Sequence, residues 1–226
     1  PNTGREHVPC TLSSLRGGFN PLILHLSRSD KCKWKVQGTQ FPVRGLGAAP
    51  PRKEPMFLAD QWQDYEVLDC GGGEKLERWG DVYLRRPDPQ AIWPARDPSL
   101  WRKAQAHYHR SEKGGGSWEF FTKLPDRWVM NYKNLRFYVR PTGFKHTGLF
   151  PEQAANWDWM TDLVAERVKQ GREVRVLNLF AYTGGATMAC AAAGAQVCHC
   201  DAAKGMVQWA RENRECCGLP EDRVRW

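Results

Sequence analysis

The chain has 226 residues, 41% hydrophobic and 26% charged, which is the balance of a globular protein rather than a fibrous or disordered one. No apolar run reaches the ~18 residues of a membrane span. The eight cysteines include no C-x-x-C pair, so we expect a reducing, cytoplasmic setting. The net charge of +8 is uneven: residues 1–55 hold nine Lys and Arg against three Asp and Glu, which leaves only +2 for residues 56–226. Charge alone therefore does not indicate a nucleic-acid partner.

Residues 1–55 differ in composition and periodicity from the rest of the chain. They hold seven of the fifteen prolines, lack sustained periodicity and run into the linker-like segment GLGAAPPRKEP. At Met56 the composition changes abruptly. We expect residues 1–55 to form a disordered or non-native leader and Met56 to be the natural start; a disordered basic tail that binds RNA weakly is the alternative.

Residues 56–145 read as a small β-rich module. YEVLDC (65–70) is followed by a triple-glycine turn, and DVYLRRP (81–87) alternates with period two, so both predict strands. KGGGSWEFF (113–121) marks another turn. The segment 127–141 predicts two strands with a hairpin turn at residues 131–134.

Residues 146–226 change to the pattern of an α/β domain. A helix ending at Gly171 is predicted by apolar residues at Ala154, Trp157, Met160, Val164 and Val168. Strand and helix then alternate over residues 173–180, 186–193, 195–201 and 206–218, and a third strand begins at Val224. This order predicts a parallel sheet with right-handed crossovers.

The turn after the first of these strands carries the cofactor argument. It lies at the carboxyl edge of the sheet, where ligands bind, and Gly184 and Gly185 let a ligand approach the backbone closely. Asp201, at the end of the next strand, is placed to accept hydrogen bonds from both ribose hydroxyls. Tyr182 and Thr183 stand where a dinucleotide motif has glycines. A cofactor without phosphate, S-adenosylmethionine, therefore fits better than NAD; a packing glycine pair in an unrelated α/β domain is the alternative.

Metal binding is not predicted. Cys198-His199-Cys200 lies in an alternating apolar run, in which Cys198 and Cys200 share one strand face and His199 points to the other. No other set of Cys and His has the spacing of a zinc site. We therefore expect no metal.

Several segments together resemble the class I S-adenosylmethionine-dependent methyltransferases of the bacterial 23S rRNA cytosine-5 and guanine-7 group, in a shorter branch without a PUA domain. They are GEKLERWG (73–80), RRPDPQAIWP (85–94), HTGLFPEQAANW (146–157), LNLFAYTGGAT (177–187) and DAAKGMVQWAREN (201–213). The resemblance implies a Rossmann-like domain behind the β-rich module, and ribosomal RNA as the substrate. It also implies that HTGLFPEQ forms part of the cofactor pocket, although His146 and Glu152 stand where relatives have Lys and Asp. The candidate cofactor contacts are Gln153, Phe180, Ala181, Tyr182, Thr183, Gly184, Gly185, Asp201 and Ala202.

The acceptor half of the chemistry is not found in the sequence. The resemblance implies seven strands and an acidic-Pro-Pro motif, whereas the chain supplies about three strands and has Pro-Pro only at 50–51. We assign no catalytic role to Cys216 or Cys217 and expect the catalytic residues beyond Trp226. The tryptophans Trp93, Trp101 and Trp118 predict either core packing or a base-stacking surface. A small-molecule or protein substrate, or a non-catalytic nucleoside-binding module, are the alternative functions.

Overall fold

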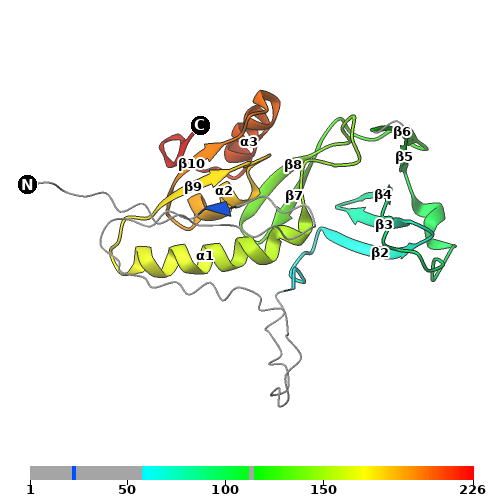
Figure 1. Cartoon of the computed structure of the whole chain (residues 1–226), viewed down its shortest axis with the longest axis horizontal. Helices are drawn as coiled ribbons and strands as arrows, with labels where there is room; N and C mark the ends of the chain where they lie inside the picture. Colours follow the sequence, from blue (N-terminus) through cyan, green and yellow to red (C-terminus); the bar gives the residue numbers. More distant parts are fainter. Residues whose placement is uncertain (1–21, 24–57, 112–114) are drawn as a thin grey trace, which may run out of the picture.

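The described part of the chain consists of two sheets, a β-hairpin and three helices (Figure 1). The computed structural model describes residues 22–23, 58–111 and 115–226. In Figure 1 the five-stranded sheet lies on the right and the sheet with parallel strands lies on the left, with the hairpin between them. No helix among these residues is long and apolar enough to cross a membrane.

The five-stranded sheet is antiparallel except for the pairing of β4 with β5. Its strands, in spatial order, are β2 (Tyr65–Gly71), β3 (Glu74–Trp79), β4 (Val82–Pro87), β5 (Ala106–Arg110) and β6 (Gly116–Phe120). A 3₁₀ turn at Leu100–Lys103 precedes β5. The predictions at β2 and β4 are confirmed, whereas β3, β5 and β6 were not predicted as strands.

The predicted hairpin is confirmed as β7 (Trp128–Tyr132) and β8 (Leu135–Val139). Its turn contains Lys133 at a φ of 52°. Alternate residues of the hairpin are buried and belong to a core cluster that also includes residues of α1, β9, α2 and β10. β8 packs against α2 and α3, so the hairpin joins the β-rich module to the α/β part.

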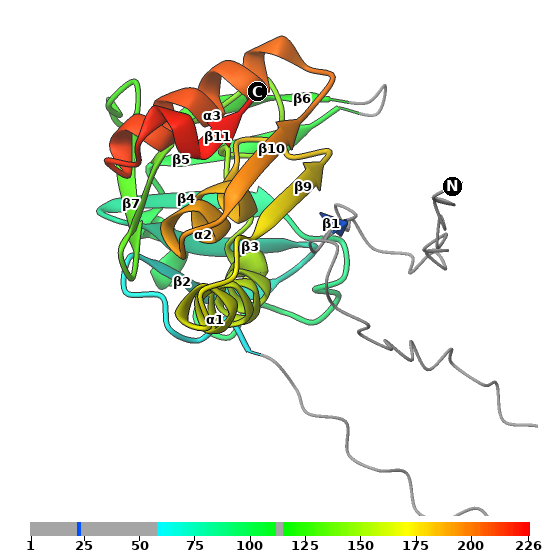
Figure 2. The same cartoon turned by 90° about the vertical axis from the view of Figure 1, so that its left-hand side faces the viewer.

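The α/β part follows the predicted order (Figure 2). Its elements are α1 (Ala154–Lys169), β9 (Arg175–Leu179), α2 (Gly185–Ala192), β10 (Gln196–Cys200), α3 (Lys204–Cys216) and β11 (Val224–Arg225). β9, β10 and β11 are parallel neighbours, as expected for right-handed β-α-β units. Short 3₁₀ turns at Pro151–Gln153 and Glu221–Arg223 precede α1 and β11.

Helix α1 forms where the apolar spacing predicts it. Ala154, Trp157, Met160 and Val164 are buried, and the helix packs against α2. Gly171, at a φ of 75°, stands just past the helix end, where only a residue without Cβ adopts that backbone shape readily.

Of the predicted leader, only two residues are described. Leu22–Ile23 form β1, which pairs antiparallel with Leu177 and Asn178 on the free edge of β9. The rest of that prediction lies outside the described residues.

Candidate cofactor site

The loop between β9 and α2 has an unusual backbone. Phe180 and Tyr182 have φ angles of 53° and 52°, and Gly184 has 88°. The left-handed region is unfavourable for residues with a Cβ, and Phe180 and Tyr182 are two of only three such residues among those described. Such conformations persist where the surrounding structure enforces them, and they concentrate at functional sites.

Hydrogen bonds to the Gly148 segment and to α3 hold this loop in place, and the residue on α3 is itself bonded to the hairpin. The hydroxyl of Thr183 donates to the carbonyl of Gly148 at 2.5 Å. The buried side chain of Asn213, on α3, donates to the carbonyl of Thr183 at 2.9 Å and accepts from the N–H of Tyr138, on β8, at 2.8 Å. The loop is therefore fixed against both α3 and the hairpin.

Asp201 joins the ends of the two central strands. Its Oδ2 accepts the N–H of Tyr182 at 2.8 Å, and its Oδ1 accepts the N–H of Ala203 at 2.8 Å. Each carboxylate oxygen has a second lone pair, so the side chain, which is half-buried, can still accept hydrogen bonds from hydroxyl groups. The carboxylate of Asp201 thus holds the loop after β9 and the loop after β10, and it can still accept further hydrogen bonds.

A pocket of about 230 Å³ opens beside the loop, between it and the start of α1. It is lined by Leu149, Phe150, Gln153, Asn156, Trp157, Trp159, Met160, Asn178, Ala181, Tyr182, Thr183, Gly185 and Ala186. This volume is below the roughly 300–1,000 Å³ of most small-molecule sites, so a nucleoside-sized ligand would extend beyond it.

The pocket combines aromatic walls with amide groups. The rings of Phe150 and Tyr182 lie 5.1 Å apart, and burial raises the pKa of Tyr182 to about 12, which keeps its hydroxyl protonated. Asn156 donates to the side-chain oxygen of Gln153 at 2.9 Å. Neutral amides bind both ammonium and carboxylate groups, so this lining suits a zwitterionic ligand end.

The β-rich module also helps to shape the pocket rim. The indole N–H of Trp62, ahead of β2, donates to the carbonyl of Pro151 at 2.9 Å and so holds the 3₁₀ turn that carries Gln153. His146 lies behind the aromatic wall, with its ring 5.0 Å from that of Phe150. Burial, together with the charge of Arg86, lowers the pKa of His146, so at neutral pH its ring packs as an uncharged group.

Beneath the loop, a polar chain connects both strands to α2. Asn178 donates to the hydroxyl of Thr187 at 2.9 Å, and that hydroxyl lies 2.9 Å from Nδ1 of His199. Burial lowers the pKa of His199 to about 4, so the ring is neutral. His199 is buried, whereas Cys200 is exposed and Cys198 is half-buried, so the predicted alternation is confirmed.

The glycine pair serves packing more than the sequence interpretation assumed. A Cβ on Gly185 would lie 2.6 Å from the ring of Trp157, a pocket wall. A Cβ on Gly184 would lie 3.0 Å from Met188 and 3.2 Å from Ala210. The missing side chain of Gly184 therefore permits the α2–α3 contact, and the close approach of a ligand at this residue stays a prediction.

The predicted contacts divide into two groups. Gln153, Ala181, Tyr182, Thr183 and Gly185 line the pocket. Phe180, Gly184, Asp201 and Ala202 do not, and Phe180 is 62% exposed.

Sequence reasoning missed several lining residues. Trp157 and Met160 were assigned to the core face of α1, and their second role as pocket walls has no separate signal. Asn178 does have one, because it is the single polar residue inside the apolar run LNLF. Asn156 follows Gln153 by three positions, which places both on one helical face.

Residues 91–226 match the family described as S-adenosylmethionine-dependent methyltransferase. The chain is 31% identical over 217 residues to the ribosomal RNA large subunit methyltransferase K/L of Magnetococcus marinus, which covers 95% of this chain and 27% of that protein. The protein of the same name from Shewanella frigidimarina is 31% identical over 143 residues, covering 63% of this chain and 18% of that protein.

Among solved structures, the chain is similar to the SAM-dependent methyltransferase from Agrobacterium tumefaciens. The two superpose with a TM-score of 0.68 and are 39% identical, over 73% of this chain and 52% of that one. The chain thus spans about half of that structure and less than a third of the two curated relatives.

Proposed function

The chain belongs to the S-adenosylmethionine-dependent methyltransferase family, and on that premise we propose that the β9–α2 loop, Asp201 and the adjoining pocket bind S-adenosylmethionine. The observation that carries the proposal is the position of Asp201, which is bonded to the N–H of Tyr182 at the carboxyl edge of the parallel sheet. A nucleoside placed along that edge has its ribose beside a carboxylate with free lone pairs.

Different residues bind different parts of the cofactor. Asp201 accepts the ribose hydroxyls, and the amide groups of Gln153 and Asn156 meet the amino-acid end inside the pocket. Tyr182 connects the ribose site to the pocket, because its N–H donates a hydrogen bond to Asp201 and the residue also lines the pocket. Bound S-adenosylmethionine supplies an electrophilic methyl group. The chain's own contribution is positioning and exclusion of water by the aromatic walls.

We propose RNA, and ribosomal RNA in particular, as the methyl acceptor. Support comes from the two relatives named as ribosomal RNA large subunit methyltransferases. The β-rich module adds an exposed aromatic residue, because Trp93 is 51% exposed, whereas Trp101 and Trp118 are half-buried. The indole N–H of Trp93 donates to the carbonyl of Cys70 at 2.9 Å, which holds the ring in place at the surface. A cytoplasmic location fits an RNA substrate and the free thiols of the described cysteines.

Electrophoretic mobility with a ribosomal RNA fragment tests the substrate class. The logarithm of the binding constant should fall linearly with the logarithm of the salt concentration, as for a phosphate-tracking surface. Trp93→Ala should weaken binding by about 5- to 150-fold if a base stacks there, which corresponds to ~1–3 kcal/mol. Ile92→Ala is the matched control, because Ile92 is 85% exposed beside Trp93 but has no ring.

Absence of RNA binding at low salt would favour the alternatives, a small-molecule or protein substrate or a nucleoside-binding module without catalysis. The alternatives would also be favoured if duplex DNA of the same length bound as tightly as the RNA fragment. The acceptor base and the catalytic residues form no part of the proposal.

A further inference from the structure

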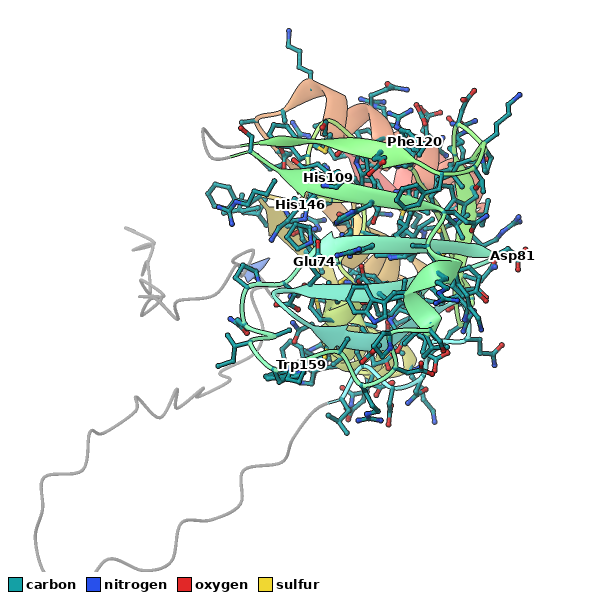
Figure 3. The ribbon with its side chains drawn as sticks, turned by 90° about the vertical axis from the view of Figure 1, so that its right-hand side faces the viewer. Glu74, Asp81, His109, Phe120, His146 and Trp159 are labelled. Atoms are coloured by element: carbon teal, nitrogen blue, oxygen red, sulfur yellow. The ribbon has the colours of Figure 1, made fainter. Side chains whose placement is uncertain are left out.

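One face of the five-stranded sheet carries a row of side chains that are polar except for the buried Leu76. Asp69, Leu76, Arg85, His107 and Glu119 are cross-strand neighbours from β2 to β6, so all five point to the same side of the sheet. His109 follows His107 by two residues and shares this face. Figure 3 views this side of the molecule, with Glu74 and His109 labelled on adjoining parts of the sheet.

At the β5–β6 end of the row, three metal-ligating side chains converge. Ligand atoms of His107, His109 and Glu119 all lie within 4.8 Å of one another. Nε2 of His109 is 2.7 Å from Oε2 of Glu119, and the rings of His107 and His109 have centroids 3.9 Å apart. Two imidazoles and a carboxylate are ligands that zinc and related divalent ions prefer.

A carboxylate outside the cluster orients its buried histidine. Nε2 of His107 lies 2.6 Å from Oε1 of Glu74, and Nε of Arg85 donates to the other oxygen of Glu74 at 2.5 Å. This pairing leaves Nδ1 of His107 as the nitrogen that is open to an ion. Metal-binding histidines commonly bond a carboxylate through the second ring nitrogen, which fixes the ring and its tautomer.

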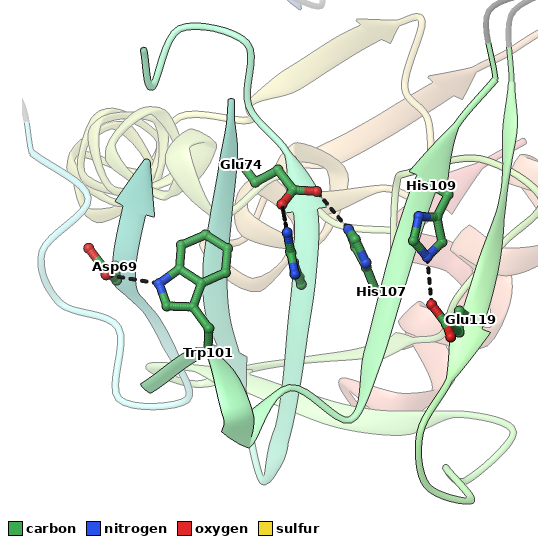
Figure 4. A network of polar contacts seen from close by, with 7 residues as sticks. Asp69, Glu74, Trp101, His107, His109 and Glu119 are labelled. Carbon is green, nitrogen blue, oxygen red and sulfur yellow. Dashed lines mark hydrogen bonds and ion pairs between the residues drawn. The ribbon is translucent and has the colours of Figure 1, made fainter. Parts of the chain in front are cut away.

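The carboxylate is in turn held by a network that runs across the sheet (Figure 4). The guanidinium of Arg85 lies over the ring of Trp101, 5.2 Å from its centroid, and the indole N–H of Trp101 donates to Asp69 at 2.9 Å. Asp69 also accepts the N–H groups of Arg96 and Asp97. The support behind His107 is therefore built from three strands, β2, β3 and β4, and from the 3₁₀ turn that carries Trp101.

We propose that His107, His109 and Glu119 form a binding site for a divalent transition-metal ion of the zinc type. His107 and His109 come from alternate positions of β5, and Glu119 comes from the position opposite His107 on β6, so one ion ties the two strands together. Glu74 acts on the ion only through His107. Three protein ligands leave one tetrahedral position for water.

The proposal departs from the expectation that the protein binds no metal. That expectation rested on spacing along the chain, and the H-x-H pair of a strand has no helical or C-x-x-C signature. The third ligand lies ten residues further on and meets the pair only through the register of β5 with β6. The site is independent of the proposed cofactor pocket, so failure of either leaves the other intact.

Calorimetric titration of the full, chelator-treated chain with Zn²⁺ tests the site. We expect His109→Ala and Glu119→Ala each to weaken one Zn²⁺-binding event by at least about ten-fold, and Glu74→Gln to weaken it by about 10- to 100-fold. His109 and Glu119 are about half-exposed, with side-chain exposures of 49% and 56%, so neither variant should unfold the chain. Glu66→Gln is the matched control, because Glu66 is an exposed glutamate on β2 outside the cluster.

Imidazole NMR signals separate this site from thiols elsewhere in the chain. Substoichiometric Zn²⁺ should shift the ring signals of His107 and His109 and leave those of His199 unchanged. The proposal is overturned if these two signals do not move, or if both alanine variants bind Zn²⁺ within two-fold of the parent chain. The contacts of the row would then be ion pairs and hydrogen bonds of the sheet face only.

Discussion

At the scale of single residues, the loop after β9 is shaped by what it packs against. Gly185 lies against Trp157, and Thr183 and Asn213 tie the loop to Gly148 and to α3. A sequence shows that a glycine is present, but it does not show which neighbour a Cβ would meet. The sequence therefore shows where the glycine pair stands, but not that Gly184 faces Met188 and Ala210.

Gly185→Ala should destabilise the protein and disturb the pocket. The new Cβ would lie 2.6 Å from the ring of Trp157, which must move, and overpacking of this kind costs typically 1–3 kcal/mol. Gly205→Ala is the control, because its Cβ meets nothing within 4 Å in the first turn of α3 and it should stabilise the protein by about 0.4–1 kcal/mol. Urea denaturation of both variants decides; equal midpoints would contradict the packing reason.

At the scale of elements, β3 and β4 are joined by a buried ion pair. Arg86 donates to both oxygens of Glu77, at 2.5 and 2.7 Å, and Tyr65 donates to the same carboxylate at 2.6 Å. Arg86 also donates to the carbonyl of Lys145, at 2.9 Å, and so connects the sheet to the HTGLFPEQ segment. These contacts explain how Glu77, in a strand as charged as EKLERW, comes to be fully buried.

Glu77→Gln should cost about 3–5 kcal/mol of folding free energy, because it leaves the buried guanidinium of Arg86 without a counter-charge. Glu66→Gln, which removes an exposed partner of Arg78, should change stability by at most about 1 kcal/mol. Chemical denaturation at pH 7 measures both.

The same pair predicts loss of stability in acid. Burial alone would raise the pKa of Glu77, but the Arg86 guanidinium lowers it to about 2, below the roughly 4.3 of an unfolded glutamate. The contribution of Glu77 is therefore full above about pH 4.3 and is lost as the pH falls toward 2. Glu77→Gln should make the free energy of unfolding less dependent on pH in this range. If the dependence below pH 4.3 is the same in the variant and the parent chain, other groups cause the loss of stability in acid.

Periodicity is the reason some elements were predictable and others were not. Helix α1 and strands β9 and β10 follow apolar patterns of period 3.6 or near-continuous runs, and all three are confirmed. Strand β3 has four charged residues among six and no apolar alternation, and the partners of Glu74, Glu77 and Arg78 include residues of β2 and β4, so its burial depends on tertiary pairing. The pocket has the same limit, because its lining comes from three segments brought together by the fold.

At the scale of the whole molecule, the described core is continuous. Its cluster runs from Trp79 on β3 through the hairpin and α1 to Val224 on β11. Residues 1–55 contribute one short pairing to the described structure, β1 on β9. In the described residues, this leader therefore meets the edge of β9, and we predict that it is dispensable for folding.

A chain that begins at Met56 should melt within about 4 °C of the full chain. Within the described residues, removal of 1–55 deletes the two-residue pairing of β1 with β9. A change of ~1 kcal/mol shifts the melting temperature of a protein of this size by about 2–4 °C. Differential scanning calorimetry of both chains measures the shift. A much larger drop would show that the leader packs on the folded part.

The central claim is that this edge of the sheet binds S-adenosylmethionine through Asp201. Calorimetric titration with S-adenosylhomocysteine, with NAD as the comparison ligand, tests it most directly. Hydrogen bonds to a charged acceptor contribute about 1.5–3 kcal/mol, so Asp201→Ala should weaken binding by roughly ten- to a hundred-fold, while Asp81→Ala, an exposed acid between β3 and β4, should not. Tighter binding of NAD, or an unchanged affinity for S-adenosylhomocysteine in Asp201→Ala, would contradict the account.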